Sequence, residues 1–235
     1  SEMCIRDSGR GGMATVYRGR HAELEVVRAV KLVTTRDPAA LQRFSREAAR
    51  LAKVDRHPGV VRVHAHGVTP AGQAWLALEL VEGQDLEQAL AELLTSGPLP
   101  VDRALDVLIQ AARGVDALHA AGVVHRDLKP GNVLLRSDDA PALADFGLAL
   151  DLEEERLTQT KQLLGTPAYM APERDERLTS TGAVVGTILY LAPEQLNGTV
   201  SPAVDVHALG LVLYEALTGE AAAPVGDAGP LTTLA

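Results

Sequence analysis

The chain has few aromatic residues, one cysteine and no long hydrophobic run, and each shortage narrows what it can be. Phe, Trp and Tyr make up 3% of the 235 residues, so Ala, Leu and Val must fill most of the core. A single cysteine, Cys4, cannot form an internal disulfide, which favours a reducing compartment. No apolar run reaches the ~18 residues of a membrane span, and no signal peptide is visible. We expect a cytoplasmic domain, with membrane attachment only through a parent region outside this sequence.

Positive charge is also scarce. The 22 Lys and Arg residues against 31 Asp and Glu residues give a net charge of −9 at pH 7. A surface of this sign repels the phosphates of DNA and RNA, so we expect no nucleic-acid partner. The length fits one large domain or two small lobes.

What the chain does contain is a set of acidic, amide and lysine side chains at the spacing that phosphoryl transfer needs. The segment from His125 to Asn132 reads HRDLKPGN, and Asp145-Phe146-Gly147 follows shortly downstream of it. One acid, Asp127, can accept the proton of an attacking hydroxyl. The second acid and the amide can hold a divalent metal against nucleotide phosphates.

Two upstream segments carry further candidates. Residues 9–17 read GRGGMATVY, a Gly-rich turn whose backbone N–H groups could approach phosphate, although an ordinary hairpin would look the same. The alternating segment 26–32 is predicted as a strand and carries Lys31. Apolar residues at helical spacing predict a helix over 41–53, and this helix carries Glu47. Glu47 could equally be a solvated charge on that helix.

The motifs in this order resemble the catalytic core of a eukaryotic-like protein serine/threonine kinase of the kind that many bacteria carry. The resemblance runs from about Gly9 to about Glu220 and departs from the pattern at Ala14, where a third glycine is usual. It implies an α+β, two-lobed kinase fold, with a small β-rich N-lobe over residues 9–81 and a larger helical C-lobe over residues 82–235. Residues 1–8 resemble a translated adapter sequence, and we expect a catalytic fragment truncated at both ends, with further helices beyond Ala235.

The periodicity predicts the remaining elements of this fold. Strands are expected over residues 60–63, 75–81 and 133–135, and helices over residues 85–94 and 101–121. A further apolar helix begins at Asp205. The resemblance implies that Asp205 bonds back to the backbone of the HRDLKPGN loop.

The same resemblance implies transfer of the γ-phosphate of ATP to Ser or Thr hydroxyls of protein substrates, with Mg²⁺ or Mn²⁺ as the metal. Asp127 would take the hydroxyl proton, and Lys129 would offset charge on the phosphoryl group. Lys31, held by Glu47, would orient the phosphates. Two residues would bind the metal, namely Asn132 and Asp145. The nucleotide would also contact Gly9, Gly11, Gly12, Val16, Ala29, Glu79, Val81 and Leu134.

The activation segment of the family occurs twice, because residues 156–176 and 177–197 are tandem copies of one segment. Glu173, in the first copy, lies at the family's usual separation from Asp145. Glu194, the equivalent residue of the second copy, lies at the usual separation from Asp205. The first copy therefore fits the upstream chain and the second fits the downstream chain. We expect the second copy to dock and the first to form an added loop, whether the repeat is biological or a joining error.

The resemblance also implies control by phosphorylation, in which a phosphothreonine pairs with Arg126, and self-association for autophosphorylation. The candidate threonines are Thr158, Thr160, Thr179 and Thr181. An alternative of another class is an inactive nucleotide-binding module, which the truncation and the duplicated segment would favour. Binding of adenine nucleotide without phosphate transfer would identify that alternative.

Overall fold

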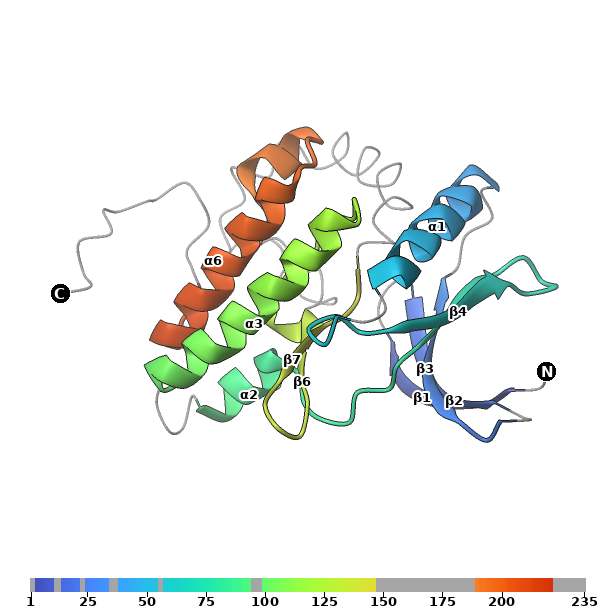
Figure 1. The fold of residues 1–235 in the computed structure, drawn as a ribbon, viewed down its shortest axis with the longest axis horizontal. Coiled ribbons are helices and arrows are strands. Elements are labelled where there is room, and N and C mark those ends of the chain that lie inside the picture. The colour runs from blue at the N-terminus through green and yellow to red at the C-terminus, as the bar shows by residue number, and fades with distance from the viewer. Residues whose placement is uncertain are drawn as a thin grey trace, which may run out of the picture.

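The computed structural model describes residues 3–10, 14–21, 24–33, 38–54, 57–93, 99–146 and 189–221. These residues form a lobe built on a β-sheet and a lobe built mainly of helices, which lie side by side (Figure 1). The two-lobed α+β fold expected from the sequence is therefore confirmed. Residues 11–13 of the Gly-rich turn and the whole first copy of the repeat lie outside the described residues.

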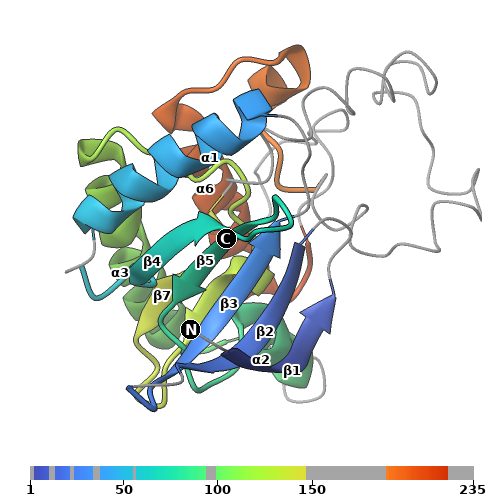
Figure 2. The same cartoon turned by 90° about the vertical axis from the view of Figure 1, so that its right-hand side faces the viewer.

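The small lobe is one antiparallel five-stranded sheet with the strand order β1-β2-β3-β5-β4 (Figure 2). Its strands are β1 Met3–Arg10, β2 Ala14–His21, β3 Val27–Val33, β4 Val63–Val68 and β5 Ala74–Leu78. Helix α1, Pro38–Leu51, continues into a 3₁₀ turn, Ala52–Val54, and packs on β4 and β5. The buried stripe of α1 includes Phe44, Ala48 and Leu51, each at most 2% exposed, which is the helical spacing that the sequence predicts.

Strand β1 contains the residues that resemble an adapter sequence. It pairs with β2 from Met3 opposite His21 to Arg10 opposite Thr15. Hydrogen bonds of a β-ladder join backbone groups, so many sequences can supply such an edge strand. The origin of residues 1–8 therefore stays a prediction.

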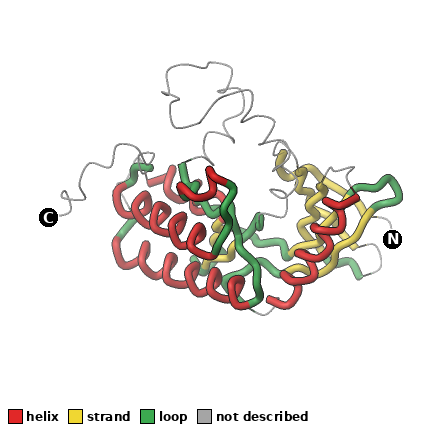
Figure 3. Tube along the Cα trace, turned by 90° about the horizontal axis from the view of Figure 1, so that it is seen from above, coloured by secondary structure: helices red, strands yellow, loops and turns green. Residues whose placement is uncertain are grey.

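The large lobe contains helices α2 Leu86–Leu93, α3 Val101–Ala120 and α6 Pro202–Thr218, and a hairpin of β6 Val133–Leu135 and β7 Pro141–Leu143. Two 3₁₀ turns complete its described part, Pro130–Asn132 and Pro193–Asn197. Helix α3 packs on α6 and on β7, and the helices lie side by side when seen from above (Figure 3). Helix α6 ends at Gly219, whose φ of 74° suits a left-handed C-cap. No helix in the described ranges is both long and apolar enough to cross a bilayer.

The segment after α1 belongs to the large lobe as much as to the small one. Val61 N–H donates to the carbonyl of Leu143 at 2.9 Å, and Leu143 N–H donates to the carbonyl of Gly59 at 2.9 Å. Val60 also forms an isolated parallel bridge with Leu143. The prediction of a strand over 60–63 is therefore wrong in its position. Those backbone groups pair with β7, and β4 begins only at Val63.

The two lobes share one hydrophobic cluster, which includes Phe44 and Leu76 from the small lobe and Leu118 and Val212 from the large lobe. The chain crosses between the lobes at Gly83. A Cβ atom on this residue would lie 1.9 Å from the carbonyl oxygen of Leu135, so the close approach requires glycine. Shared packing and a tight crossover hold the residues of both lobes in place around the candidate site.

Candidate active site

The loop 123–132 brings two predicted site side chains, Lys129 and Asn132, to the carboxylate of a third, Asp127. Asn132 Nδ2 donates to Asp127 Oδ2 at 3.0 Å and to the carbonyl of Asp127 at 2.6 Å. Lys129 Nζ lies 3.2 Å from the same Oδ2 atom. The side chain of Asp127 keeps 20% of its surface exposed, so its oriented carboxylate can still meet a hydroxyl of another molecule.

The backbone of this loop is held by a buried carboxylate of α6. Asp205 is 1% exposed, and its two oxygens accept the backbone N–H groups of His125 and Arg126, each at 2.8 Å. The expected bond from Asp205 to the loop is thus confirmed. Arg126 has a φ of 69°, which non-glycine residues adopt rarely, so these bonds also offset backbone strain. A third donor, His119 Nε2, lies 2.7 Å from Asp205 Oδ2, and no motif of the sequence singled out His119.

The two lobes meet at a lysine–aspartate pair. Lys31 Nζ lies 3.1 Å from Asp145 Oδ1, and the lysine side chain is 9% exposed. A buried ammonium needs such a counter-charge, because burial without one is costly. Asp145 also has a left-handed φ, of 56°. Ala144 N–H donates to the carbonyl of Asn132 at 2.9 Å, which fixes Asp145 relative to the loop that carries Asp127.

Glu47 has a different partner from the one that the sequence predicts. Its Oε1 atom lies 3.8 Å from Arg126 NH2, with both side chains about one-fifth exposed (20% and 23%). The amine of Lys31 instead contacts Asp145. The predicted ion pair between Lys31 and Glu47 is therefore not the arrangement in this structure. The physical reason is that the loop offers Glu47 a second cation while Asp145 satisfies Lys31.

His125 is fully buried beneath the site. Its Nε2 atom lies 2.9 Å from the carbonyl oxygen of Ala144, and its ring lies 5.4 Å from that of Phe146. Because a carbonyl only accepts, Nε2 must carry the proton. Burial lowers the pKa of His125, since the imidazolium would lose its hydration. A neutral ring therefore joins the loop to the segment that carries Asp145.

The predicted nucleotide-binding residues of the sheet share one face. Val16 lies opposite Lys31 in the β2–β3 register, and Ala29 lies two positions before Lys31 on β3. Both relations place side chains on the same side of a sheet. Val81, just before the crossover at Gly83, and Leu134, from the large lobe, are half-buried and pack against the core. Gly9 lies in β1, and Gly11 and Gly12 lie outside the described residues.

Glu79 offers less of its backbone than predicted. Its N–H group donates to the carbonyl of Arg62 at 2.8 Å, so of its two backbone groups only the carbonyl is left for the predicted nucleotide contact. Its carboxylate forms two hydrogen bonds with Arg136, one of them very short and the other, NH2 to Oε2, of 3.2 Å. The hydrogen bond from Arg136 lowers the pKa of Glu79, and the same bond raises the pKa of Arg136. Nothing in the sequence singled out Arg136.

The oxygen atoms near Asp127 suit a hard divalent cation. Asn132 uses its amide nitrogen to donate, so its oxygen is the atom that can act as a ligand. Asp145 binds Lys31 through one oxygen, which leaves the other for a metal. Among the described residues there is no group of three or more His, Cys, Asp or Glu side chains that could hold a metal alone. The donor set therefore fits an ion such as Mg²⁺, which typically completes its shell with substrate phosphates and water.

The end of the second repeat copy docks between the loop and α6. Gln195 Nε2 donates to the carbonyl of Arg126 at 3.1 Å, and Gln195 Oε1 accepts the backbone N–H of Ala192 at 2.8 Å. The hydroxyl of Tyr190 donates a short hydrogen bond to Glu215 of α6, and burial raises the pKa of this phenol. Ala192 is fully buried. The expected docking of the second copy is thus confirmed for the described residues. The expectation that the first copy loops out, and the four candidate threonines, Thr158, Thr160, Thr179 and Thr181, lie outside them.

Comparison with known proteins agrees with this geometry. The protein kinase domain family matches residues 4–179, well over half of the chain. The chain belongs to the protein kinase family. The kinase is 40% identical over 228 residues to the serine/threonine-protein kinase PknH of Mycobacterium tuberculosis, an alignment that covers 96% of this chain and 32% of PknH.

Two further relatives are bacterial proteins that are named as serine/threonine-protein kinases. PknA of Mycobacterium tuberculosis is 36% identical over 229 residues, covering 94% of this chain and 47% of PknA. The probable serine/threonine-protein kinase PknB of Lactococcus lactis is 33% identical over 220 residues, covering 92% of this chain and 31% of PknB. The kinase thus spans between about a third and about a half of the length of these relatives. Protein kinases use ATP and a divalent metal and act on protein substrates.

Proposed function

We propose that this kinase transfers the γ-phosphoryl group of ATP to Ser or Thr hydroxyls of proteins, with Mg²⁺ or Mn²⁺ as the metal. One observation carries the proposal. The Asp127 carboxylate is oriented by Asn132 and Lys129 on a loop whose backbone is held by Asp205. This is the arrangement that a positioned proton acceptor needs. The names of the relatives support protein Ser/Thr hydroxyls as the acceptors.

Each residue of the site has a role in this proposal. Asp127 accepts the proton of the attacking hydroxyl, and Lys129, close to it, offsets negative charge on the transferred group. Lys31 orients the nucleotide phosphates from the opposite lobe. Asn132 and Asp145 hold the metal, which neutralises phosphate charge when bound. Catalysis then depends on positioning and electrostatics, and the site is already oriented by its own hydrogen bonds.

The Arg126–Glu47 contact supports a regulatory role for both residues. A phosphothreonine at one of the four candidate positions would carry about two negative charges and would compete with Glu47 for the guanidinium of Arg126. Glu47 would then be released toward Lys31, the partner that the sequence predicts. Phosphorylation would thus replace the Arg126–Glu47 pair by a pair of Arg126 with the phosphate and a pair of Glu47 with Lys31, which now contacts Asp145.

The location and the partners of the kinase are also part of the proposal. A cytoplasmic location supplies ATP to the site, and any membrane anchor belongs to a parent region outside this sequence. Self-association of two copies would allow one to phosphorylate the other. The alternative of an inactive nucleotide-binding module gains no support from the relatives, which carry kinase names.

The test is phosphate transfer itself. The chain should incorporate the γ-phosphate of ATP on threonine in the presence of Mg²⁺ or Mn²⁺, with a rate per molecule that rises with protein concentration if two copies must meet. Asp127→Asn should lower that rate by orders of magnitude while nucleotide affinity stays nearly constant, because the acid acts at the transfer step. Nucleotide binding with no transfer by the unaltered chain would instead establish the inactive module.

A further inference from the structure

The peptide group that precedes Asp127 is held by a side chain from outside the loop. Gln195 Nε2 donates to the carbonyl oxygen of Arg126 at 3.1 Å. That oxygen belongs to the same planar peptide group as the N–H of Asp127, so the hydrogen bond restricts how this peptide group can rotate. Gln195 lies in the turn Pro193–Asn197, which ends the second repeat copy. The orientation of the predicted proton acceptor therefore depends on a residue of the docked segment.

The peptide groups on either side are held as well. Arg126 N–H donates to Asp205 Oδ1 at 2.8 Å, and the carbonyl of Asp127 accepts from Asn132 Nδ2 at 2.6 Å. Gln195 thus holds the middle one of three successive peptide groups. Removing its hydrogen bond would loosen the peptide group that leads directly into Asp127.

The backbone conformation at this point needs such support. Arg126 has a φ of 69°, in the left-handed region that non-glycine residues adopt rarely. A conformation of this kind persists only where the surrounding structure holds it. Asp205 holds the N–H of Arg126 and Gln195 holds its carbonyl, so the strained residue is held from both sides. If the hydrogen bond from Gln195 is lost, we expect Arg126 to relax and the Asp127 carboxylate to turn.

Gln195 uses both ends of its amide. Its Oε1 accepts the backbone N–H of Ala192 at 2.8 Å, while its Nε2 donates to Arg126. Since a backbone N–H only donates and a carbonyl only accepts, these partners fix which end of the amide faces the loop. An ionised glutamate could accept from Ala192 but could not donate, whereas a lysine could donate but could not accept. Substitution by these two residues therefore separates the two hydrogen bonds.

We propose that Gln195 is a positioning residue, which keeps the Asp127 carboxylate aimed at the attacking hydroxyl by holding the carbonyl of Arg126. The inference rests on the proposed function, in which Asp127 accepts the proton of that hydroxyl. Gln195 acts through the backbone of the loop. A displacement of about 1 Å at a reacting group can cost on the order of a hundredfold in rate. Transfer then requires the end of the second copy to be docked, because that segment brings Gln195 to the loop.

The test compares three variants of the whole 235-residue chain. Gln195→Glu removes the donor to Arg126, and Gln195→Lys removes the acceptor for Ala192. The matched control is Gln110→Glu, at an exposed position of α3, where the glutamine Nε2 donates to the carbonyl of Asp106 at 3.2 Å. The measurements are the rate of γ-phosphate incorporation at saturating ATP and Mg²⁺, the affinity for the β,γ-imido analogue of ATP by calorimetric titration, and the melting temperature.

We expect Gln195→Glu to lower the transfer rate about tenfold or more, while the affinity for the analogue changes less than about twofold. Gln110→Glu should match the unaltered chain in both. Gln195→Lys should keep more of the transfer rate than Gln195→Glu, because it keeps the donor to Arg126. A merely structural role would instead make the rates follow the melting temperatures. An unchanged rate in Gln195→Glu, or an equally low rate in Gln195→Lys, would overturn the proposal.

The amide resonance of Asp127 tests the same contact without phosphate transfer. In ¹H–¹⁵N spectra of the chain labelled with ¹⁵N-aspartate, this signal is identified by its absence from Asp127→Asn. It should shift in Gln195→Glu and stay in place in Gln110→Glu, because the bond to Arg126 polarises the peptide group that contains this amide. If the unaltered chain transfers no phosphate, the proposed function fails, and this signal alone decides whether Gln195 positions Asp127. A signal that does not move in Gln195→Glu would overturn the inference.

Discussion

His119 Nε2 lies 2.7 Å from Asp205 Oδ2, the same oxygen that accepts the backbone N–H of His125. Through this carboxylate, the end of α3 and the start of α6 are joined to the loop that carries Asp127. Asp205 is 1% exposed, so its charge is compensated by these donors and not by water. A buried carboxylate with all its hydrogen bonds made holds its neighbours in place, because moving any of them would leave the carboxylate without that hydrogen bond.

Replacing this acid should destabilise the kinase strongly. Asp205→Asn presents an NH₂ group to donors that need an acceptor, so at least one of the bonds to His119, His125 N–H and Arg126 N–H must be lost. We expect a loss of ~3 kcal/mol in the free energy of unfolding, measured by urea denaturation. His119→Gln keeps a donor near Asp205 and should cost clearly less. Equal losses in the two variants would show that Asp205 does not act as the shared acceptor.

The ion pairs of the site should change with phosphorylation. The measurement is a double-mutant cycle on the free energy of unfolding. In dephosphorylated kinase, the cycle of Glu47→Gln with Arg126→Gln should give a coupling energy of ~0.5–1 kcal/mol, as expected of a half-buried pair at 3.8 Å. The cycle of Glu47→Gln with Lys31→Gln should give a coupling near zero in the same state. After threonine phosphorylation by unaltered kinase, the two couplings should exchange. Couplings that do not respond to phosphorylation would contradict the proposed release of Glu47.

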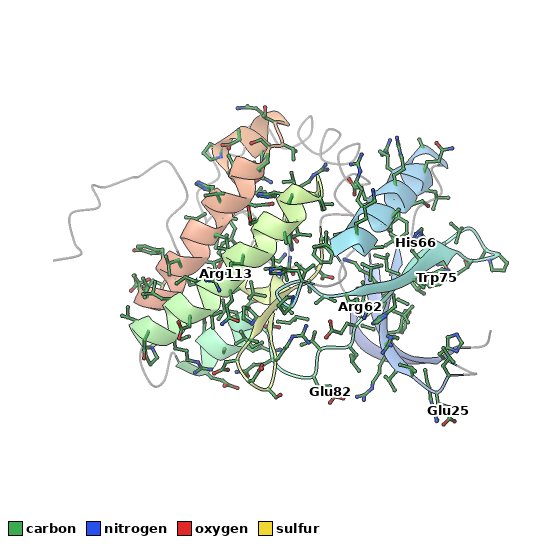
Figure 4. All side chains as sticks on the ribbon, viewed as in Figure 1. Glu25, Arg62, His66, Trp75, Glu82 and Arg113 are labelled. Atoms are coloured by element: carbon green, nitrogen blue, oxygen red, sulfur yellow. The ribbon has the colours of Figure 1, made fainter. Side chains whose placement is uncertain are left out.

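Acidification should weaken the fold through His125. Burial lowers the pKa of this histidine in the folded state below the ~6.5 of an unfolded chain. The unfolded state therefore binds more protons at low pH, so the stability contribution of the neutral ring is fully present above about pH 6.5 and is lost as the pH falls. His125→Gln should show a flatter decline in unfolding free energy between about pH 7 and pH 5. His66→Gln, at an exposed position of β4 (Figure 4), serves as the control and should keep the decline of the unaltered chain.

Deleting one repeat copy should destabilise the kinase more than deleting the other. Deleting residues 156–176 would bring Glu194 as close to Asp145 along the chain as Glu173 is in the unaltered sequence. By loop-closure entropy this shortening changes the free energy of unfolding by only ~0.5 kcal/mol. Deleting residues 177–197 instead would bring Arg174 to the position of Gln195.

Arginine cannot replace Gln195, because it has no acceptor for the backbone N–H that Gln195 Oε1 accepts from Ala192. The deletion of the second copy should therefore cost ~1–2 kcal/mol more than the deletion of the first. Thermal or urea unfolding of both variants decides the matter. A smaller loss on deleting residues 177–197 would reverse our assignment of the docked copy.

The sequence predicts the central part of the site well because its residues lie close together along the chain. Asp127, Lys129 and Asn132 lie on one short loop, and the backbone of that loop dictates that they meet. Strands and helices can also be predicted, because apolar residues recur at strand spacing in β3 and at helical spacing in α1. Asp145 could be placed because its motif ends the β6–β7 hairpin directly beside the loop.

The sequence does not predict which partners distant charges choose. His119 and Asp205 are 86 residues apart, and Glu79 and Arg136 are 57 apart. Such pairs depend on how helices and lobes pack, which local patterns do not encode. Glu47 illustrates the point, because its carboxylate lies beside Arg126 while its predicted partner, Lys31, contacts Asp145. The position of β4 was missed for the same reason, since the backbone partners of residues 59–61 lie in the other lobe.

The pairing of Gly59 and Val61 with Leu143 bears on how the chain folds during its synthesis. A ribosome releases the whole small lobe before it makes residue 143, so residues 59–61 must wait for a partner that does not yet exist. Until then, the backbone groups before β4 stay solvated and the buried face of α1 has only part of its final surroundings. We therefore expect that the small lobe does not complete its fold on its own. Its last stretch becomes ordered only when β7 has left the ribosome, so the two lobes should fold as one cooperative body.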